Sequence, residues 1–106
     1  MMLAETRVTG KPTTPTLADI ARVLRPLLPP GYRAVLFGSR ASGQASPRSD
    51  WDIGIVGPEP LSGALLERLR DSLDGLPTLH SFDVVDLAAA APEFRKLALA
   101  RTVEIA

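Results

Sequence analysis

Apolar residues recur with a helical period in three segments of this 106-residue chain. That period predicts helices over residues 16–28, 61–74 and 92–104. Short β-prone runs between them predict strands at 32–38, 50–56 and 81–87. The order helix-strand-strand-helix-strand-helix is typical of an α+β domain, an α/β two-layer arrangement with helices on one face of a sheet. We therefore predict a small mixed β-sheet of about three to four strands covered by helices.

The folded domain is expected to begin near Thr16. Residues 1–15 are rich in Thr, Pro and Gly and show no apolar period, which predicts a flexible N-terminal arm. Thr16 followed by Asp19 is typical of a capping box at a helix start. We therefore assign 1–15 to the arm and 16–106 to a single domain.

The composition excludes several classes of protein. Twelve basic and twelve acidic residues give no net charge, which argues against a general nucleic-acid or membrane-surface binder but leaves room for a nucleotide. The absence of cysteine excludes disulfides, thiolate metal sites and a cysteine nucleophile, and one histidine cannot form a histidine-rich metal site. No apolar run reaches bilayer length and no signal peptide is evident, so we expect a cytoplasmic protein.

Two acids stand at the start of the second predicted strand. Asp50 and Asp52 are two residues apart, so on a strand their carboxylates point to the same face. Two such charges repel each other, and a divalent cation between them removes that repulsion. Mg²⁺ is bound through one or two carboxylates together with water and phosphate oxygens, so this pair suits a nucleotide–metal site, although Asp-x-Asp alone at a strand start is more often a turn or cap.

The third strand offers two candidates for a third acid. Asp83 lies inside an apolar run, where we expect it to need a partner, whereas Asp86 stands at the strand end, where exposure costs little. We therefore take Asp83 as the third member of the site and Asp86 as a bystander.

A phosphate-binding turn is expected after the first strand. Gly38 permits close approach of the backbone, and N–H groups that lead into a helical turn attract phosphate. Ser39 offers a hydroxyl and Arg40 a positive charge. Gly-Ser alone is more often an ordinary turn, but its occurrence together with acids on adjacent strands suggests phosphoryl or nucleotidyl transfer.

The segment GSRASGQASPRSDWDIGIV (38–56) resembles the signature of the DNA polymerase β-like nucleotidyltransferase superfamily, in its minimal nucleotidyltransferase (MNT) branch. That signature is Gly-Ser, ten residues and Asp-x-Asp, which Gly38-Ser39 and Asp50-Trp51-Asp52 match. The superfamily's third acid has apolar neighbours on a later strand, as Asp83 has in FDVVDL. The motifs cover 36–87, and the order of elements extends the resemblance over nearly the whole domain.

The resemblance implies a polymerase β-like fold and roles for the candidate residues. Asp50 and Asp52 would bind two Mg²⁺ ions that bridge the triphosphate of ATP. Asp83 would help to bind the second ion and would activate the acceptor hydroxyl as a base.

The resemblance also implies a phosphate site. Ser39 and the Gly38 backbone would hold the β- and γ-phosphates, with help from Arg40. The products would be a nucleotidylated acceptor and pyrophosphate.

A stand-alone domain of this size resembles the antitoxin half of HEPN–MNT toxin–antitoxin pairs. In that family the acceptor is a tyrosine of the HEPN toxin, an RNase, which adenylylation silences. The resemblance therefore implies the antitoxin of a type VII pair, with a HEPN toxin as partner in a hetero-oligomer, ATP as substrate, and no membrane or direct nucleic-acid contact.

Two rival functions and one structural alternative remain open. The chain is either an antitoxin that acts by contact with an unused site, or a nucleotidyltransferase whose small-molecule or RNA acceptor is held by a separate subunit. The structural alternative is a domain with acidic turns and no catalysis. An exposed Trp51 face and the apolar last helix suggest an interface, although packing in the core explains both equally well, and His80 lies either near the site or in solvent.

Overall fold

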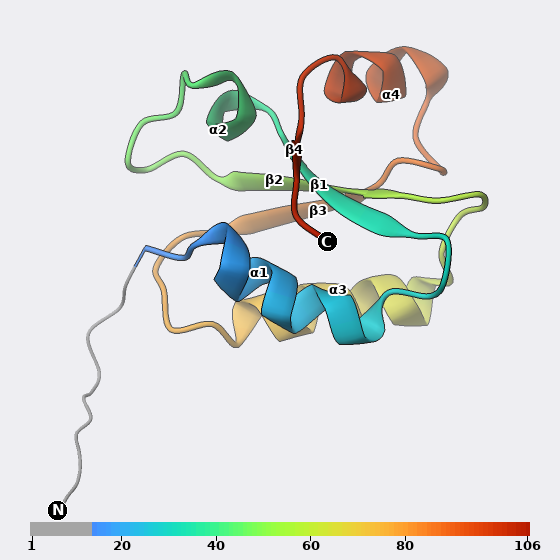
Figure 1. The fold of residues 1–106 in the computed structure, drawn as a ribbon, viewed down its shortest axis with the longest axis horizontal. Helices are drawn as coiled ribbons and strands as arrows, with labels where there is room; N and C mark the ends of the chain where they lie inside the picture. The colour runs from blue at the N-terminus through green and yellow to red at the C-terminus, as the bar shows by residue number, and fades with distance from the viewer. Residues whose placement is uncertain (1–13) are drawn as a thin grey trace, which may run out of the picture.

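The computed structural model describes residues 14–106, so that all but the last two residues of the predicted arm lie outside it. It shows a four-stranded sheet with helices on both sides (Figure 1). The elements in chain order are α1 (Leu17–Leu24), the 3₁₀ helix η2 (Arg25–Leu27), β1 (Arg33–Phe37), α2 (Ser39–Ser42), β2 (Trp51–Val56), α3 (Gly63–Asp74), β3 (Phe82–Asp86), α4 (Pro92–Leu99) and β4 (Val103–Glu104).

The sheet is mixed, with strand order β3-β2-β1-β4. Strand β1 pairs antiparallel with both β2 and β4, whereas β2 and β3 are parallel. A parallel pair needs a crossover connection, which α3 provides between β2 and β3. The starts of β2 and β3 therefore lie at the same edge of the sheet. The predicted α+β class and strand number are confirmed.

Helices α1 and α3 cover one face of the sheet, as Figure 1 shows. Ile53 and Ile55 alternate along β2, point to this face and are fully buried. They belong to one core with Leu24 of α1 and with Leu69 and Leu73 of α3, which are also fully buried. Burial of each such side chain contributes roughly 1.5–3 kcal/mol, so this layer supplies the main core.

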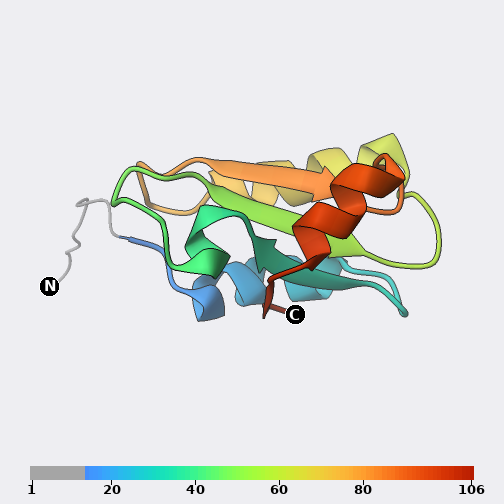
Figure 2. The ribbon, with the colours of Figure 1, turned by 90° about the horizontal axis from the view of Figure 1, so that it is seen from above.

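The opposite face carries a smaller apolar cluster beneath α4. Val35 and Phe37 of β1 form this cluster with Leu87 and with Ala98 of α4. The ring of Phe94 meets that of Phe37 edge-on at 6.0 Å between centroids. Figures 1 and 2 show α4 over this side of the sheet, so the expectation that helices cover one face only is wrong. The periodicity of α4 alone did not reveal which face it covers.

The last predicted helix is too long. Helix α4 ends at Leu99, and Val103 and Glu104 pair with Leu36 and Val35 as the edge strand β4. Ile105 follows and is buried in the main core. The β-branched side chains at the end of the chain favour strand over helix, which explains the change. Within residues 14–106, the helices are all too short or too polar to cross a membrane.

The first helix begins as its capping box predicts. The Thr16 hydroxyl accepts from the Asp19 N–H at 3.1 Å, and the Asp19 carboxylate accepts from the Thr16 N–H at 3.0 Å. The α-helix ends at Leu24 and continues as a 3₁₀ turn that contains Pro26. The chain then turns at Gly31 and enters β1.

Candidate active site

Three candidate acids gather where β2 and β3 begin. Asp52 is the second residue of β2, and its partner in the parallel register of β3 is Asp83. Registered neighbours on adjacent strands point to the same face and lie roughly 4.7–4.9 Å apart between strands. Asp50 stands two residues before Asp52, just ahead of β2. The structure therefore brings together the three acids that the sequence singled out.

The charges of these acids oppose one another. Burial raises the pKa of the Asp52 carboxyl above its ordinary value. The negative charges of Asp83 and Asp50 raise that pKa further. Asp52 is half-buried, whereas Asp50 and Asp83 are exposed. Among residues 14–106 no ion pair involves these three acids, so this edge of the sheet concentrates negative charge.

The donor chemistry of the acids fits a hard divalent cation. Mg²⁺ prefers carboxylate oxygens, and a cation would relieve the repulsion that raises the pKa of Asp52. The side chains do not form a complete metal-binding site by themselves: within residues 14–106, no three His, Asp or Glu residues converge closely enough to hold an ion. Mg²⁺ generally completes its coordination with water and substrate phosphates, so a partial ligand set is compatible with it.

The Gly38–Ser39 turn lies directly against Asp52. Gly38 has φ 75° and ψ −153°, a conformation that is essentially restricted to glycine. A Cβ atom at position 38 would collide with Oδ2 of Asp52. The helical turn α2 starts at Ser39, and the N–H groups of Ala41 and Ser42 bond to the Gly38 carbonyl. The backbone therefore approaches the acid as closely as the sequence predicts.

Arg40 has a role that the sequence did not reveal. Its Nε and Nη2 donate to the carbonyl oxygen of Ser49 at 3.1 and 2.8 Å. Its guanidinium carbon lies 4.3 Å from the centroid of the Trp51 ring, and Nη2 lies 3.3 Å from Nδ1 of His80. Arg40 thus ties α2 to the residue before Asp50 and to the loop before β3.

The burial of Trp51 and His80 settles two open alternatives. Trp51 is only 7% exposed and belongs to the main core, so its face is packed and is not an exposed interface. His80 is half-buried beside Arg40 and lies with Asp50 in the lining of one cavity. The position of His80 next to the acids could not be read from one isolated histidine.

Asp83 and Asp86 have the opposite environments to those expected. Asp83 is exposed, whereas Asp86 is buried at 9% exposure. Oδ2 of Asp86 accepts from the Leu61 N–H at 2.7 Å, and Oδ1 accepts from the Ala88 N–H at 3.1 Å. The expectation that Asp86 is exposed at a strand end is wrong, because its carboxylate is buried and accepts N–H groups from two loops. Asp83 is the acid of β3 that lies in register with Asp52.

A cavity of about 280 Å³ opens beside the acids. It lies between the loop that leads into β2 and the loop that leads into β3. Its lining residues are Pro47, Arg48, Asp50, Leu79, His80 and Ser81. The candidate site therefore has a preformed hollow on its β3 side.

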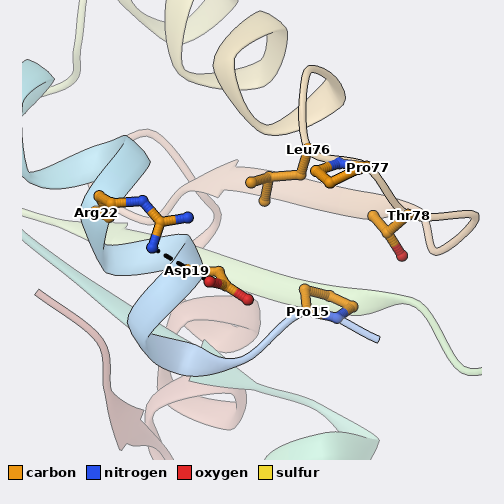
Figure 3. Close-up of a pocket in the computed structure, with 6 residues that line it drawn as sticks. All are labelled: Pro15, Asp19, Arg22, Leu76, Pro77 and Thr78. Carbon is orange, nitrogen blue, oxygen red and sulfur yellow. Dashed lines mark hydrogen bonds and ion pairs between the residues drawn. The ribbon is translucent and has the colours of Figure 1, made fainter. Parts of the chain in front are cut away.

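A second, smaller cavity lies between α1 and the segment after α3, as Figure 3 shows. It has a volume of about 110 Å³ and is lined by Pro15, Asp19, Arg22, Leu76, Pro77 and Thr78. Asp19 and Arg22 form an ion pair with each other at 3.2 Å. Within the described part of the chain, no predicted site residue lines this cavity, so the candidate chemistry lies at the sheet edge.

Comparison with known sequences identifies the family. The profile of the family described as "Polymerase beta, Nucleotidyltransferase" matches residues 32–106. A curated relative from Haemophilus influenzae, described as "Probable protein adenylyltransferase MntA", is 32% identical over 81 residues. The aligned region covers 76% of this chain and 70% of the relative.

Solved structures with the same fold include toxin–antitoxin complexes. A chain in a structure described as a toxin–antitoxin with AMP-PNP matches with a TM-score of 0.61 and 25% identity, over 82% of this chain and 69% of that chain. A chain in the complex of a tri-AMPylated Shewanella oneidensis HEPN toxin with an MNT antitoxin matches with a TM-score of 0.58 and 22% identity. The match covers 85% of this chain and 68% of that one, and at this identity it shows the fold alone.

Proposed function

Because this chain belongs to the polymerase beta nucleotidyltransferase family, we propose that it is a protein adenylyltransferase that acts as an antitoxin. It transfers AMP from ATP to a hydroxyl group, a tyrosine hydroxyl, on a partner HEPN toxin, and so forms a type VII toxin–antitoxin pair in the cytoplasm. The observation that carries this proposal is the register of Asp52 with Asp83, directly against the Gly38 turn. The curated relative supports the reaction class, and the toxin–antitoxin complex with AMP-PNP supports a toxin as the partner.

The three acids are proposed as the ligands of the magnesium ions. Asp50 and Asp52 contribute from β2 and its entry, and Asp83 contributes from β3. When bound, two Mg²⁺ ions would supply positive charge that offsets both the triphosphate and the carboxylates. Asp83 is exposed on β3, and we assign to it the role of accepting the proton of the acceptor hydroxyl.

Gly38 and Ser39 are proposed to hold the β- and γ-phosphates. The Gly38 backbone lies directly against Asp52 with no side chain between them, and Ser39 follows at the start of α2 with a hydroxyl and an N–H group to offer to phosphate. Arg40 is engaged with Ser49 and His80, so we assign it to positioning the acid loop rather than to direct phosphate contact. The catalytic domain is proposed to span 16–106.

The proposed transfer balances in bonds and protons, with the side chains named above as the protein's contribution. The acceptor oxygen forms a bond to the α-phosphorus of ATP, and the bond from that phosphorus to the oxygen shared with the β-phosphate breaks. Pyrophosphate leaves with the electron pair, and the hydroxyl proton passes to the Asp83 carboxylate and then to solvent. Transfer to a hydroxyl therefore needs no further co-reactant.

Contact neutralisation is the second candidate function. Three apolar side chains of α4 and one of β4 are exposed, namely Phe94 at 42%, Leu97 at 76%, Leu99 at 37% and Val103 at 37%. A surface of this kind suits a partner protein. It serves a contact antitoxin and an enzyme that must hold its toxin equally well, so it does not replace the catalytic proposal.

The direct test is transfer of label from ATP labelled on the α-phosphate to a purified HEPN partner. We expect a labelled toxin band with Mg²⁺, and none with excess chelator or with Asp50→Asn/Asp52→Asn. Asp86→Asn, assayed at a temperature where it remains folded, should retain transfer. Label on RNA or on a small molecule would indicate a different acceptor. Neutralisation without any label would favour the contact antitoxin.

A further inference from the structure

We propose that the cavity beside Asp50 is the acceptor site, and that it receives an aromatic hydroxyl side chain, a tyrosine, from the partner protein. The proposal rests on the proposed function, because it names where the group that accepts AMP enters. The residues that line the cavity come from two loops, 43–50 before β2 and 75–81 before β3.

The order of strands places this cavity opposite the phosphate turn. Gly38 and Ser39 follow β1, the acids of β2 lie in the centre, and β3 lies on the far side of β2. Phosphoryl transfer brings the attacking and leaving oxygens roughly into line on opposite sides of the phosphorus. With pyrophosphate held at the β1 side, the acceptor oxygen approaches from the β3 side. The cavity opens on that side, with Asp50 in its wall.

The composition of the cavity fits a protein segment. Leu79 is 87% exposed and Pro47 is exposed, so together they offer apolar contact to an aromatic ring. Arg48 is also exposed and has no ion-pair partner among residues 14–106. It therefore presents a positive charge to an acidic group beside the tyrosine. The hydroxyl end of the ring would then lie toward Asp50.

The two walls of the cavity are held in place by one side chain. Arg40 donates twice to the carbonyl of Ser49 in the wall that carries Asp50. The same guanidinium lies 3.3 Å from Nδ1 of His80 in the other wall and stacks on the ring of Trp51. The spacing of the walls is therefore fixed before a ligand binds, which reduces the ordering cost of binding.

The cavity is large enough for one aromatic side chain. Clefts that enclose whole small-molecule ligands generally measure about 300–1,000 Å³. The cavity here measures about 280 Å³ and is open to solvent on its Leu79 side. It admits the side chain of a segment that lies across its mouth. The group transfer is the one described above: the phenolic oxygen bonds to the α-phosphorus, and pyrophosphate departs on the opposite side.

The test uses two exposed positions of the cavity and one matched control. Leu79→Ser and Arg48→Glu change the lining without disturbing the core, and Arg68→Glu makes the same charge change at an exposed arginine of α3, away from the cavity. Initial rates are measured with α-labelled ATP and the purified HEPN toxin as acceptor, and affinity for AMP-PNP is measured separately. Circular dichroism confirms that each variant is folded.

We expect each cavity variant to raise the KM for the toxin about tenfold, a larger effect than most interface side chains show. Affinity for AMP-PNP should stay within about twofold, and Arg68→Glu should leave the KM for transfer nearly unchanged. Unchanged KM in both cavity variants would overturn the proposal, as would an equal rise in Arg68→Glu. Loss of AMP-PNP affinity would also overturn it, by placing the base in the cavity. A wild-type chain that transfers nothing would instead refute the proposed function itself.

Discussion

Replacement of Asp86 by alanine is expected to lower the stability of this domain far more than the same change at Asp83. The Asp86 carboxylate is buried and accepts N–H groups from Leu61, at 2.7 Å, and from Ala88, at 3.1 Å. Leu61 lies 25 residues away in sequence, so this bond fastens the entry of α3 to the end of β3. Asp83 is exposed three residues earlier on the same strand and serves as the matched control.

The magnitude follows from these two bonds. A hydrogen bond to a charged group contributes about 1.5–3 kcal/mol, and its loss leaves an unpaired N–H group partly buried. Because the loops can relax toward water, we expect Asp86→Ala to lower the free energy of unfolding by about 2–4 kcal/mol. That is a large share of the roughly 5–15 kcal/mol typical of a domain. Asp83→Ala should change it by less than about 0.5 kcal/mol.

Urea denaturation followed by the fluorescence of Trp51 measures both changes. Trp51 is the single tryptophan of the chain and is buried in the main core, so its emission reports global unfolding. With a denaturant slope of about 1–3 kcal/mol per molar urea, the Asp86→Ala midpoint should fall by about 1–2 M. Equal destabilisation by Asp83→Ala, or a silent Asp86→Ala, would refute the assignment of Asp86 as the structural acid.

Three further predictions concern the site itself. Asp52→Asn should stabilise the fold at pH 7 by about 0.5–1 kcal/mol, the scale of like charges on neighbouring strands, while abolishing transfer. The folded protein raises the pKa of Asp52, so the charged carboxylate destabilises the fold fully above that raised pKa. This destabilisation disappears below the ordinary pKa of 3.8, where the carboxyl is protonated in both the folded and the unfolded state. The urea midpoints of the wild type and of Asp52→Asn should therefore converge at acid pH. Gly38→Ala should lower the free energy of unfolding by about 1–3 kcal/mol and remove most transfer activity. Gly63→Ala, where nothing lies within 4 Å of an added Cβ, should leave the urea midpoint unchanged. Arg40→Met should lower kcat with affinity for AMP-PNP kept within about twofold, because its guanidinium holds Ser49; a large loss of AMP-PNP affinity would show phosphate contact instead.

The spacing of the acids made the centre of the site predictable from sequence. Alternation along a strand predicts that Asp50 and Asp52 share one face, and β2 begins at Trp51, directly after Asp50. The partnership of Asp83 with Asp52 followed from the expectation that the two strands are adjacent, and the parallel register bears it out. Local periodicity therefore sufficed where the chemistry depends on strand geometry.

Features that depend on distant contacts were not predictable. The burial of Asp86 arises from Leu61, and the orientation of Arg40 arises from His80, 40 residues away. The helical spacing after Leu97 continued past the true end of α4, since periodicity alone does not show that Val103 pairs with β1. These side chains are positioned by tertiary packing, which overrides local preference.

The mass of the HEPN partner after co-expression with this chain tests the central claim most directly. Partner purified from cells with the wild-type chain is compared with partner from cells with the Asp50→Asn/Asp52→Asn variant. The account predicts a gain of one or more AMP units on a tyrosine with the wild type and an unmodified partner with the variant. An unmodified but silenced toxin in both cases would contradict it and would leave neutralisation by contact as the function.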